Sequence, residues 1–582
     1  MKMIKQLSKC IREYKLSSIL TPFLVSLEVI MEVFIPFLMG KMIDDGIDKG
    51  DTAFVVKTGI LLVVICLFSL FFGVAAGVTA AKASAGFAKN LRHDMFHNVQ
   101  SFSFANIDRF SAAGLVTRLT TDVTNLQNSY QMIIRIAVRS PAMLIFSLVM
   151  ALGINGKISS VFLCVIPLLG LGLGLVVKYA HPIFKRVFKT YDRLNSVVAE
   201  NLHGIRVVKS FVRETEEEKK FRSVSDTIYS DTKRAENIIA FNAPLMQTAT
   251  YTCILLIAWF GAKLIVGSGE TEMTTGDLVS LLSYVMQILM NLMALSMIFV
   301  MLTMSKAAGE RVCEVLSEKS DLVNPENPVY SVNDGSIDFE DVSFAYARES
   351  ENYCLKDINL HIESGETVGI IGSTGSSKTT LVQLIARLYD TSKGTVRVGG
   401  RDVRDYDLDT LRSAVAMVLQ KNVLFSGTIS ENLRWGDENA SDEEIRRVCE
   451  MAQAHYFIEE KEEGYGTFIE QGGTNVSGGQ KQRICIARSL LRKPKILILD
   501  DSTSAVDTAT DAKIRKAFSE YIPETTKIII AQRISSIEGT DKIIVLDDGG
   551  VSGFGTHKEL LENNAIYREV YFSQQKGGND SE

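Results

Sequence analysis

The sequence has little of what marks a disulfide-bonded, metal-binding or nucleic-acid-binding protein. Its 582 residues include 8 cysteines and 7 histidines. The cysteines are scattered and form no CxxC pair, so neither a disulfide framework nor a zinc site is expected. The formal net charge is −6, and no region carries a sustained basic face, which gives no reason to expect nucleic-acid binding. The basic, amphipathic first 15 residues lack the small-residue cleavage site of a secretory signal, so we expect the first helix to be retained.

The hydrophobic residues are unevenly distributed. They make up 46% of the chain but form long runs only in the first 304 positions. A chain of this length is expected to contain more than one domain. We therefore predict a transmembrane domain over 1–304, a linker over 305–335, a soluble domain over 336–575 and a polar tail over 576–582.

Six apolar stretches are long enough to cross a bilayer, which takes about 20 residues. They cover 17–42, 55–80, 133–153, 159–180, 238–267 and 279–304. The links after the second and fourth stretches are long and basic, with residues such as Arg92, Arg118 and Lys185, whereas the short links are acidic. The positive-inside rule places the long links and both termini in the cytoplasm. The expected location is a bacterial-type plasma membrane, crossed six times.

A few polar residues interrupt these apolar stretches. Glu28 and Glu32 lie one helical turn apart in the first, and Arg135 and Arg139 are spaced similarly in the third. Gln287 and Asn291 lie in the sixth. Charge inside a membrane is costly unless it is paired or faces water. Two interpretations remain open: a polar cavity that contacts a solute, or carboxylates and arginines that pair with each other, which the sequence favours.

A glycine-rich loop in the soluble half has the context of a phosphate-binding site. A short apolar strand over 367–371 precedes it and a helix-like stretch follows, the arrangement that such a loop requires. Backbone N–H groups can surround phosphate oxygens, Lys378 can reach the terminal phosphates, and Thr379 can bind Mg²⁺. The expected nucleotide-binding residues are Gly372, Ser373, Thr374, Gly375, Ser376, Ser377, Lys378, Thr379 and Thr380.

Two further motifs follow in a fixed order. The apolar strand 495–500 ends in Asp500, a position from which a carboxylate can hold Mg²⁺ beside the phosphate loop. The segment 476–483 has the sequence VSGGQKQR. It is a far more specific indicator of function than the phosphate loop or the strand 495–500.

With these motifs the soluble half resembles an ATP-binding cassette, and the whole chain resembles an ABC exporter half-transporter. The implied fold is a six-span α-helical bundle with long cytoplasmic helices, joined to an α/β P-loop NTPase cassette that binds ATP and Mg²⁺. The resemblance assigns adenine stacking to Tyr346, Mg²⁺ sensing to Gln420 and Mg²⁺ binding to Thr379, Gln420 and Asp500. It also implies that Asp507, in the segment 504–507, crosses a dimer interface.

The resemblance further implies that two cassettes close head to tail. Each ATP then lies between one chain's phosphate loop and the other chain's signature, here Ser477, Gly478, Gly479 and Gln480. A second half-transporter is therefore an expected partner. The segments 111–118 and 200–207, at the tips of the long links, correspond to the short coupling helices that dock onto cassettes in such exporters.

Three positions depart from the family pattern. The residue after the magnesium aspartate is normally a glutamate that positions water, but here Asp501 is shorter by one methylene. The switch position after the strand 528–531 is Gln532 in place of histidine, and glutamine cannot become cationic. Ser377 replaces the usual glycine before the lysine of the phosphate loop.

All three departures fall in the half-site that this chain's own core builds, while its signature is intact. This asymmetry resembles the degenerate subunit of bacterial heterodimeric multidrug-type exporters. We expect the chain to bind ATP with poor hydrolysis of its own and to complete the catalytic site of a partner that has the glutamate and histidine. A slow homodimer, an importer and an ATP-gated regulator without transport remain alternatives. The apolar spans are compatible with an amphipathic solute.

Overall fold

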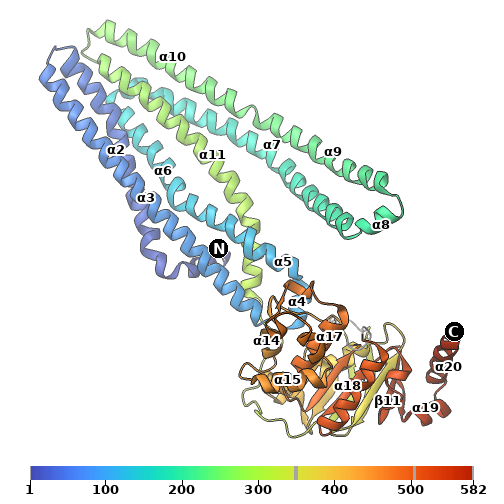
Figure 1. Ribbon diagram of the computed structural model, residues 1–582. Helices are drawn as coiled ribbons and strands as arrows, with labels where there is room; N and C mark the ends of the chain where they lie inside the picture. The colour runs from blue at the N-terminus through green and yellow to red at the C-terminus, as the bar shows by residue number, and fades with distance from the viewer. Residues whose placement is uncertain (1, 347–351, 502–505, 580–582) are drawn as a thin grey trace. The chain divides into compact units, whose positions relative to one another are not determined.

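The computed structural model describes residues 2–346, 352–501 and 506–579 (Figure 1). The chain forms two compact units. One contains Met1–Gln100 and Ala112–Glu318, and the other contains Ser101–Ser111 and Lys319–Glu582. The short segment Ser101–Ser111 therefore belongs to the soluble unit, although the membrane unit flanks it on both sides in the sequence.

Long helices make up the membrane unit. Within the described residues, six helices are long and apolar enough to cross a membrane, as the sequence predicted. The elements are α1 (Lys2–Ser8), η1 (Lys9–Tyr14), α2 (Lys15–Lys41), η2 (Met42–Ile47), α3 (Thr52–Gln100), α5 (Ala112–Thr117), η3 (Arg118–Asp122), α6 (Val123–Ile154), α7 (Gly156–His203), α8 (Ile205–Ser210), α9 (Glu214–Ile239), α10 (Asn242–Ser268) and α11 (Thr275–Ser317). In Figure 1, α7 and α9 run side by side as a long hairpin that turns at α8.

The predicted start of the linker at residue 305 is wrong, because α11 continues to Ser317. The polar residues after position 304 mark the point where the helix leaves its apolar surroundings, not where it ends. Ala308, Val312 and Val315 remain buried and hold this last part of the helix in place. The connector to the soluble domain therefore begins after Ser317.

Arg139 of α6 pairs with two carboxylates of α2. The Arg139 Nη2 atom donates to both carboxylate oxygens of Glu32, at 2.8 and 2.7 Å, and Arg139 Nε lies 3.6 Å from Glu28 Oε1. Gly73 of α3 packs against Glu28, where an added Cβ would lie 3.2 Å from its Oε1 atom. The pairing interpretation is therefore confirmed for Glu28, Glu32 and Arg139, which lie where three helices meet.

Two sheets build the soluble unit. The antiparallel sheet has the order β2-β1-β4-β5, and the six-stranded sheet has the order β12-β11-β3-β10-β9-β6. The strands are β1 (Ile337–Phe344), β2 (Leu355–Ile362), β3 (Thr367–Gly372), β4 (Lys393–Val398), β5 (Arg401–Asp402), β6 (Val415–Val418), β9 (Ile496–Asp500), β10 (Thr526–Ile530), β11 (Lys542–Asp547) and β12 (Gly550–Gly555), and β7 (Gly427–Thr428) pairs separately with β8 (Phe468–Ile469).

The larger sheet brings distant motifs to one edge. Its strands β3, β10, β9 and β6 are parallel neighbours, and β9 and β10 are buried along their whole length. Strands that are buried along their whole length are typical of a parallel sheet that is covered on both faces. The carboxyl ends of parallel strands form the ligand site of α/β folds, so the residues that follow β3, β9 and β10 meet there.

Apart from α4, the helices of the soluble unit follow β3 in the sequence (Figure 1, yellow to red). They are α12 (Lys378–Ile385), α13 (Leu408–Ala414), α14 (Ile429–Arg434), α15 (Asp442–Met451), α16 (His455–Glu459), α17 (Gly478–Leu491), α18 (Thr508–Tyr521), α19 (His557–Asn563) and α20 (Ala565–Asn579). The α17 helix is anchored by Ile484, Cys485 and Ala487, which are at most 2% exposed. Its first turn carries the signature residues.

The helix α4 (Phe104–Phe110) contacts the rest of the soluble unit. Asp108 accepts a hydrogen bond from the Tyr389 hydroxyl at 2.8 Å, and Asn106 donates to the Lys319 carbonyl at 3.3 Å. Ser103 begins α4 with a capping box, and Ser111 ends it with a positive φ of 56°. A short helix of the soluble unit thus precedes the predicted segment 111–118, and the predicted segment 200–207 includes the turn at Gly204 between α7 and α8. Docking of either segment onto a cassette stays a prediction.

Candidate functional site

The phosphate loop connects β3 to α12 as expected. Gly372 cannot be replaced without movement, because an added Cβ would lie 2.3 Å from the Leu546 carbonyl oxygen. The Lys378 Nζ atom donates to the carbonyl oxygens of Gly372 and Ser373, both at 2.8 Å. Burial lowers the pKa of Lys378. The ammonium group thus lies over the loop, within reach of the position of a bound phosphate.

Ser377 occupies a backbone conformation that favours glycine. Its φ is 67°, in the left-handed region, directly before the first residue of α12. A residue with a Cβ pays about 1 kcal/mol there. Its side chain lies near the Cys354 thiol, outside the phosphate loop.

Ser377→Gly should therefore increase the affinity of the phosphate loop for ATP. Removing the side chain should relieve about 1 kcal/mol of backbone strain and open the approach to phosphate, partly offset by the entropy of glycine. We expect ATP to bind about two- to fivefold more tightly, measured by titration with a fluorescent ATP analogue. Ser376→Gly is the matched control and should weaken binding, because Ser376 lies in the same loop without a positive φ. Unchanged or weaker binding by Ser377→Gly would contradict the strain argument.

Thr379 and Asp500, the residues expected to bind Mg²⁺, are in direct contact. The Thr379 hydroxyl donates to Asp500 Oδ2 at 2.9 Å, and Asp500 is 2% exposed. Burial raises the pKa of this carboxyl group. A hydroxyl and a carboxylate are ligands that Mg²⁺ prefers, so these two residues fit the ion, which would offset phosphate charge. Gln420, expected beside them, donates instead to Asp501, at 3.4 Å.

Asp501 and Gln532 are in direct contact. The Gln532 Nε2 atom donates to Asp501 Oδ2 at 2.8 Å, the same oxygen that Gln420 approaches. Asp501 has a positive φ of 48°, and its N–H donates to the Ile530 carbonyl at 3.1 Å. The structure thus brings together all three residues to which the sequence assigned the catalytic and sensing positions.

Sequence reasoning missed the residue behind the switch position. Gln574 of α20 donates from Nε2 to the Gln532 carbonyl at 2.9 Å and accepts from the Ile534 N–H at 2.8 Å. Gln574 thereby holds the main chain on both sides of Arg533. No motif surrounds Gln574, so nothing in the sequence indicated this role.

Tyr346 lies at the expected nucleotide side of the loop. Its hydroxyl is 2.9 Å from Thr380 Oγ1, and its side chain is half exposed, so the ring can accept a base. Tyr389 packs edge-on against it, with ring centroids 5.2 Å apart. Sequence reasoning did not identify Tyr389, which links Tyr346 to Asp108 of α4.

The signature forms an exposed helix N-terminus. Ser477 caps α17 with a capping box completed by Gln480, and both Ser477 and Gly478 are exposed. A free helix N-terminus of this kind attracts phosphate. Asp507 accepts a hydrogen bond from the Thr510 N–H at 2.9 Å, which caps α18. Positions 504 and 505, which begin the expected interface segment 504–507, lie outside the described residues.

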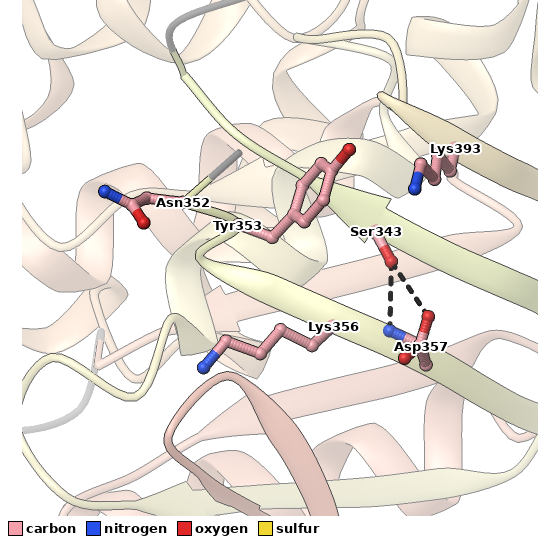
Figure 2. Close-up of a pocket in the computed structure, with 6 residues that line it drawn as sticks. All are labelled: Ser343, Asn352, Tyr353, Lys356, Asp357 and Lys393. Carbon is pink, nitrogen blue, oxygen red and sulfur yellow. Dashed lines mark hydrogen bonds between the residues drawn. The ribbon is translucent and has the colours of Figure 1, made fainter. Parts of the chain in front are cut away.

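A separate cavity of about 480 Å³ lies at the antiparallel sheet (Figure 2). Its lining residues are Ser343, Asn352, Tyr353, Lys356, Asp357 and Lys393. Ser343 and Asp357 are hydrogen-bonded to each other, and Lys393 lies over the Tyr353 ring. None of the six belongs to the phosphate loop, so this cavity is distinct from the nucleotide site.

Comparisons with known proteins agree with this geometry. Residues 18–293 match the family model described as ABC transporter transmembrane region, and residues 355–504 match the model described as ABC transporter. The chain is 37% identical to the uncharacterized ABC transporter ATP-binding protein YfiB of Bacillus subtilis, with 97% of each chain covered. It is 34% identical to the uncharacterized protein Rv1273c of Mycobacterium tuberculosis, also over 97% of each.

A solved structure has the same fold. The structure of a bacterial Atm1-family ABC exporter with ATP bound aligns with a TM-score of 0.81, covering 97% of this chain and 98% of that one at 23% identity. With its six apolar helices, phosphate loop, magnesium position and signature in one chain, the protein belongs to the ABC transporter family and combines one transmembrane region with one ATP-binding cassette.

Proposed function

We propose that this chain is the ATP-retaining subunit of a heterodimeric exporter in the bacterial plasma membrane. Its own site binds ATP and hydrolyses it slowly, while its signature completes a catalytic site on a different half-transporter. The observation that carries this proposal is the contact of Asp501 with Gln532, whose amide donates to the carboxylate at 2.8 Å.

This contact disfavours catalysis in two ways. A general base must reach within about 2.6–3.2 Å of the proton it accepts, and Asp501 is one methylene shorter than the usual glutamate. A misplacement of about 1 Å can cost a hundredfold in rate. In addition, the donors of Gln532 and Gln420 both point at Asp501 Oδ2, so this oxygen is engaged before any water arrives. Glutamine also cannot provide the positive charge of a switch histidine.

The surface of the cassette supports the presence of a partner. A groove of about 240 Å³ beside β6 is lined by residues that include Leu419, Val423 and Phe425, each more than 40% exposed. The tip around α8 carries exposed Val207 and Phe211. An equivalent apolar tip on a partner chain fits such a groove, and burying these side chains would stabilise the dimer.

Transport is tested with the complex in inside-out vesicles. We expect ATP-dependent uptake of a labelled amphipathic solute, because the long basic links and both termini are proposed to face the cytoplasm. Closure of the cassettes by ATP without flux across many solutes would instead favour a regulator. Fast single-turnover hydrolysis by the purified chain alone would contradict the degenerate site and favour a homodimer.

The contact between Asp108 and Tyr389 should couple ATP binding to the membrane helices. Tyr389→Phe removes a hydrogen bond to a charged group, worth about 1.5–3 kcal/mol, but keeps the ring beside Tyr346. We expect unchanged ATP binding and an at least fivefold lower ratio of solute moved to ATP hydrolysed, measured in the same vesicles. Tyr521→Phe, at an exposed tyrosine, is the matched control. An unchanged ratio in Tyr389→Phe would show that this contact carries no coupling.

A further inference from the structure

Gln482 is a buried polar residue that the site described above does not use. It lies two residues beyond the signature, in α17, and is 2% exposed. Its Nε2 atom donates to the main-chain carbonyl of Asp501 at 3.4 Å. Its Oε1 atom is buried and has no hydrogen-bond partner within the part of the chain that the structure describes. A buried amide oxygen without a partner is costly, so packing alone does not explain glutamine here.

This hydrogen bond joins the helix that carries the signature to the main chain of this chain's own ATP site. The first turn of α17 carries the signature, which in the proposed function faces the partner's ATP. Asp501 follows the magnesium aspartate of this chain's own site, and its side chain is held by Gln532. The later part of α17 is buried in the core. A shift of the Asp501 main chain would therefore move the first turns of the helix rather than the whole helix. A single side chain therefore bridges the two sites inside one chain.

We propose that Gln482 is a positioning residue that couples occupancy of this chain's own ATP site to the orientation of its signature. The inference rests on the proposed function: ATP retained in the slowly hydrolysing site would control the orientation of the signature. ATP held in that site fixes the main chain at Asp501, and Gln482 passes this constraint to the turn that begins at Ser477. The unpartnered Oε1 atom is available to a donor that approaches when the cassettes close.

A purely structural role predicts a different behaviour of one variant. Gln482→Met keeps the length of the side chain. It removes both the buried oxygen without a partner and the donor to the Asp501 carbonyl, effects of opposite sign, so folding should be about as stable as in the native chain. If Gln482 only fills space, the methionine variant should behave like the native protein throughout. If it couples the sites, stability should remain while the response to ATP is lost.

The experiment measures hydrogen exchange in the full chain, reconstituted with one chain per lipid nanodisc. Within one chain, no second copy can protect the signature directly. We expect ATP to slow hydrogen exchange in the first turns of α17 by about fivefold or more in the native chain. A fivefold effect is the lower end of typical coupling between two sites in a protein. In Gln482→Met the change should be less than about twofold, with equal ATP affinity and an equal thermal midpoint.

Two further variants complete the test. Gln453→Met makes the same chemical change at a glutamine whose side-chain amide donates to the Glu450 carbonyl, three residues earlier in the chain, and should keep the native response. Gln482→Glu keeps size and acceptor but loses the donor, so it should also lose the response. Native-like protection in Gln482→Met, absence of protection in the native chain, or weaker ATP binding by the variant would each overturn the proposal. The readout needs only ATP binding, so fast hydrolysis or absence of transport would refute the proposed function without altering this result.

Discussion

Ser477→Arg in this chain should abolish ATP hydrolysis by the complex with its partner. In the proposed arrangement, the signature turn donates to the phosphates of the ATP on the partner, where hydrolysis takes place. An arginine at the helix cap places a long side chain where the γ-phosphate approaches and removes the Ser477 hydroxyl from the first turn. Loss of one such donor costs about 10²–10³ in rate. We expect steady-state phosphate release to fall at least about a hundredfold.

The matched variant is Asp501→Asn in the same chain. It removes the carboxylate of this chain's own site, but that site contributes little turnover, so we expect phosphate release to change by less than about threefold. The two variants together give the asymmetry its sharpest test. A symmetric enzyme would lose activity in both cases, and a comparable loss in Asp501→Asn would therefore refute the degenerate site.

Ser477→Ala separates the structural part of this effect. Alanine loses the cap of α17 but introduces no bulk, which costs about 1 kcal/mol of stability. The complex should still assemble and hydrolyse ATP at a reduced rate. Equal inactivation by alanine and arginine would mean that loss of the Ser477 hydroxyl, as helix cap or as phosphate donor, and not the bulk of the arginine, explains the loss.

Much of the nucleotide site could be predicted because its motifs are contiguous in the sequence. The phosphate loop, the strand that ends at Asp500 and the signature each combine local structure with the chemistry that they need, and the structure places them as expected. Contacts between distant residues could not be predicted in this way. Asp108 and Tyr389 are separated by 281 positions, and no local pattern indicates that they meet.

The errors in the membrane half have a related cause. Polarity marks the point at which α11 leaves its apolar surroundings, but hydrogen bonding and buried Ala308 and Val312 determine where the helix ends. Similarly, charge and apolar periodicity predicted a helical link between the second and third spans but not the break at Ser103, where a capping box starts α4. For Glu28, Glu32 and Arg139, the high cost of unpaired charge in a membrane was enough to predict their pairing.

Asp501→Glu combined with Gln532→His should convert the retaining site into a hydrolysing one. The added methylene extends the carboxylate toward the γ-phosphate, and the histidine supplies a group that can carry positive charge. Because a 1 Å error costs about a hundredfold, we expect single-turnover hydrolysis at this site to rise about ten- to a hundredfold. Each single variant replaces only one of the two residues that contact each other. The increase in hydrolysis rate should therefore be smaller in each single variant than in the double variant, and the two increases should not be additive.

The measurement must isolate this site from the partner's. Ser477→Arg in the same chain blocks the partner's site and leaves intact the phosphate loop of this one, which the partner's signature completes. In that background, γ-phosphate release reports the repaired site alone. Ser377→Gly added to the pair should raise the rate further by tightening ATP binding at low ATP concentration, but not at saturation. If the double variant released phosphate no faster than the unrepaired site, the chemistry of Asp501 and Gln532 would not be what limits hydrolysis, and the limitation would lie in closure of the cassettes around this ATP.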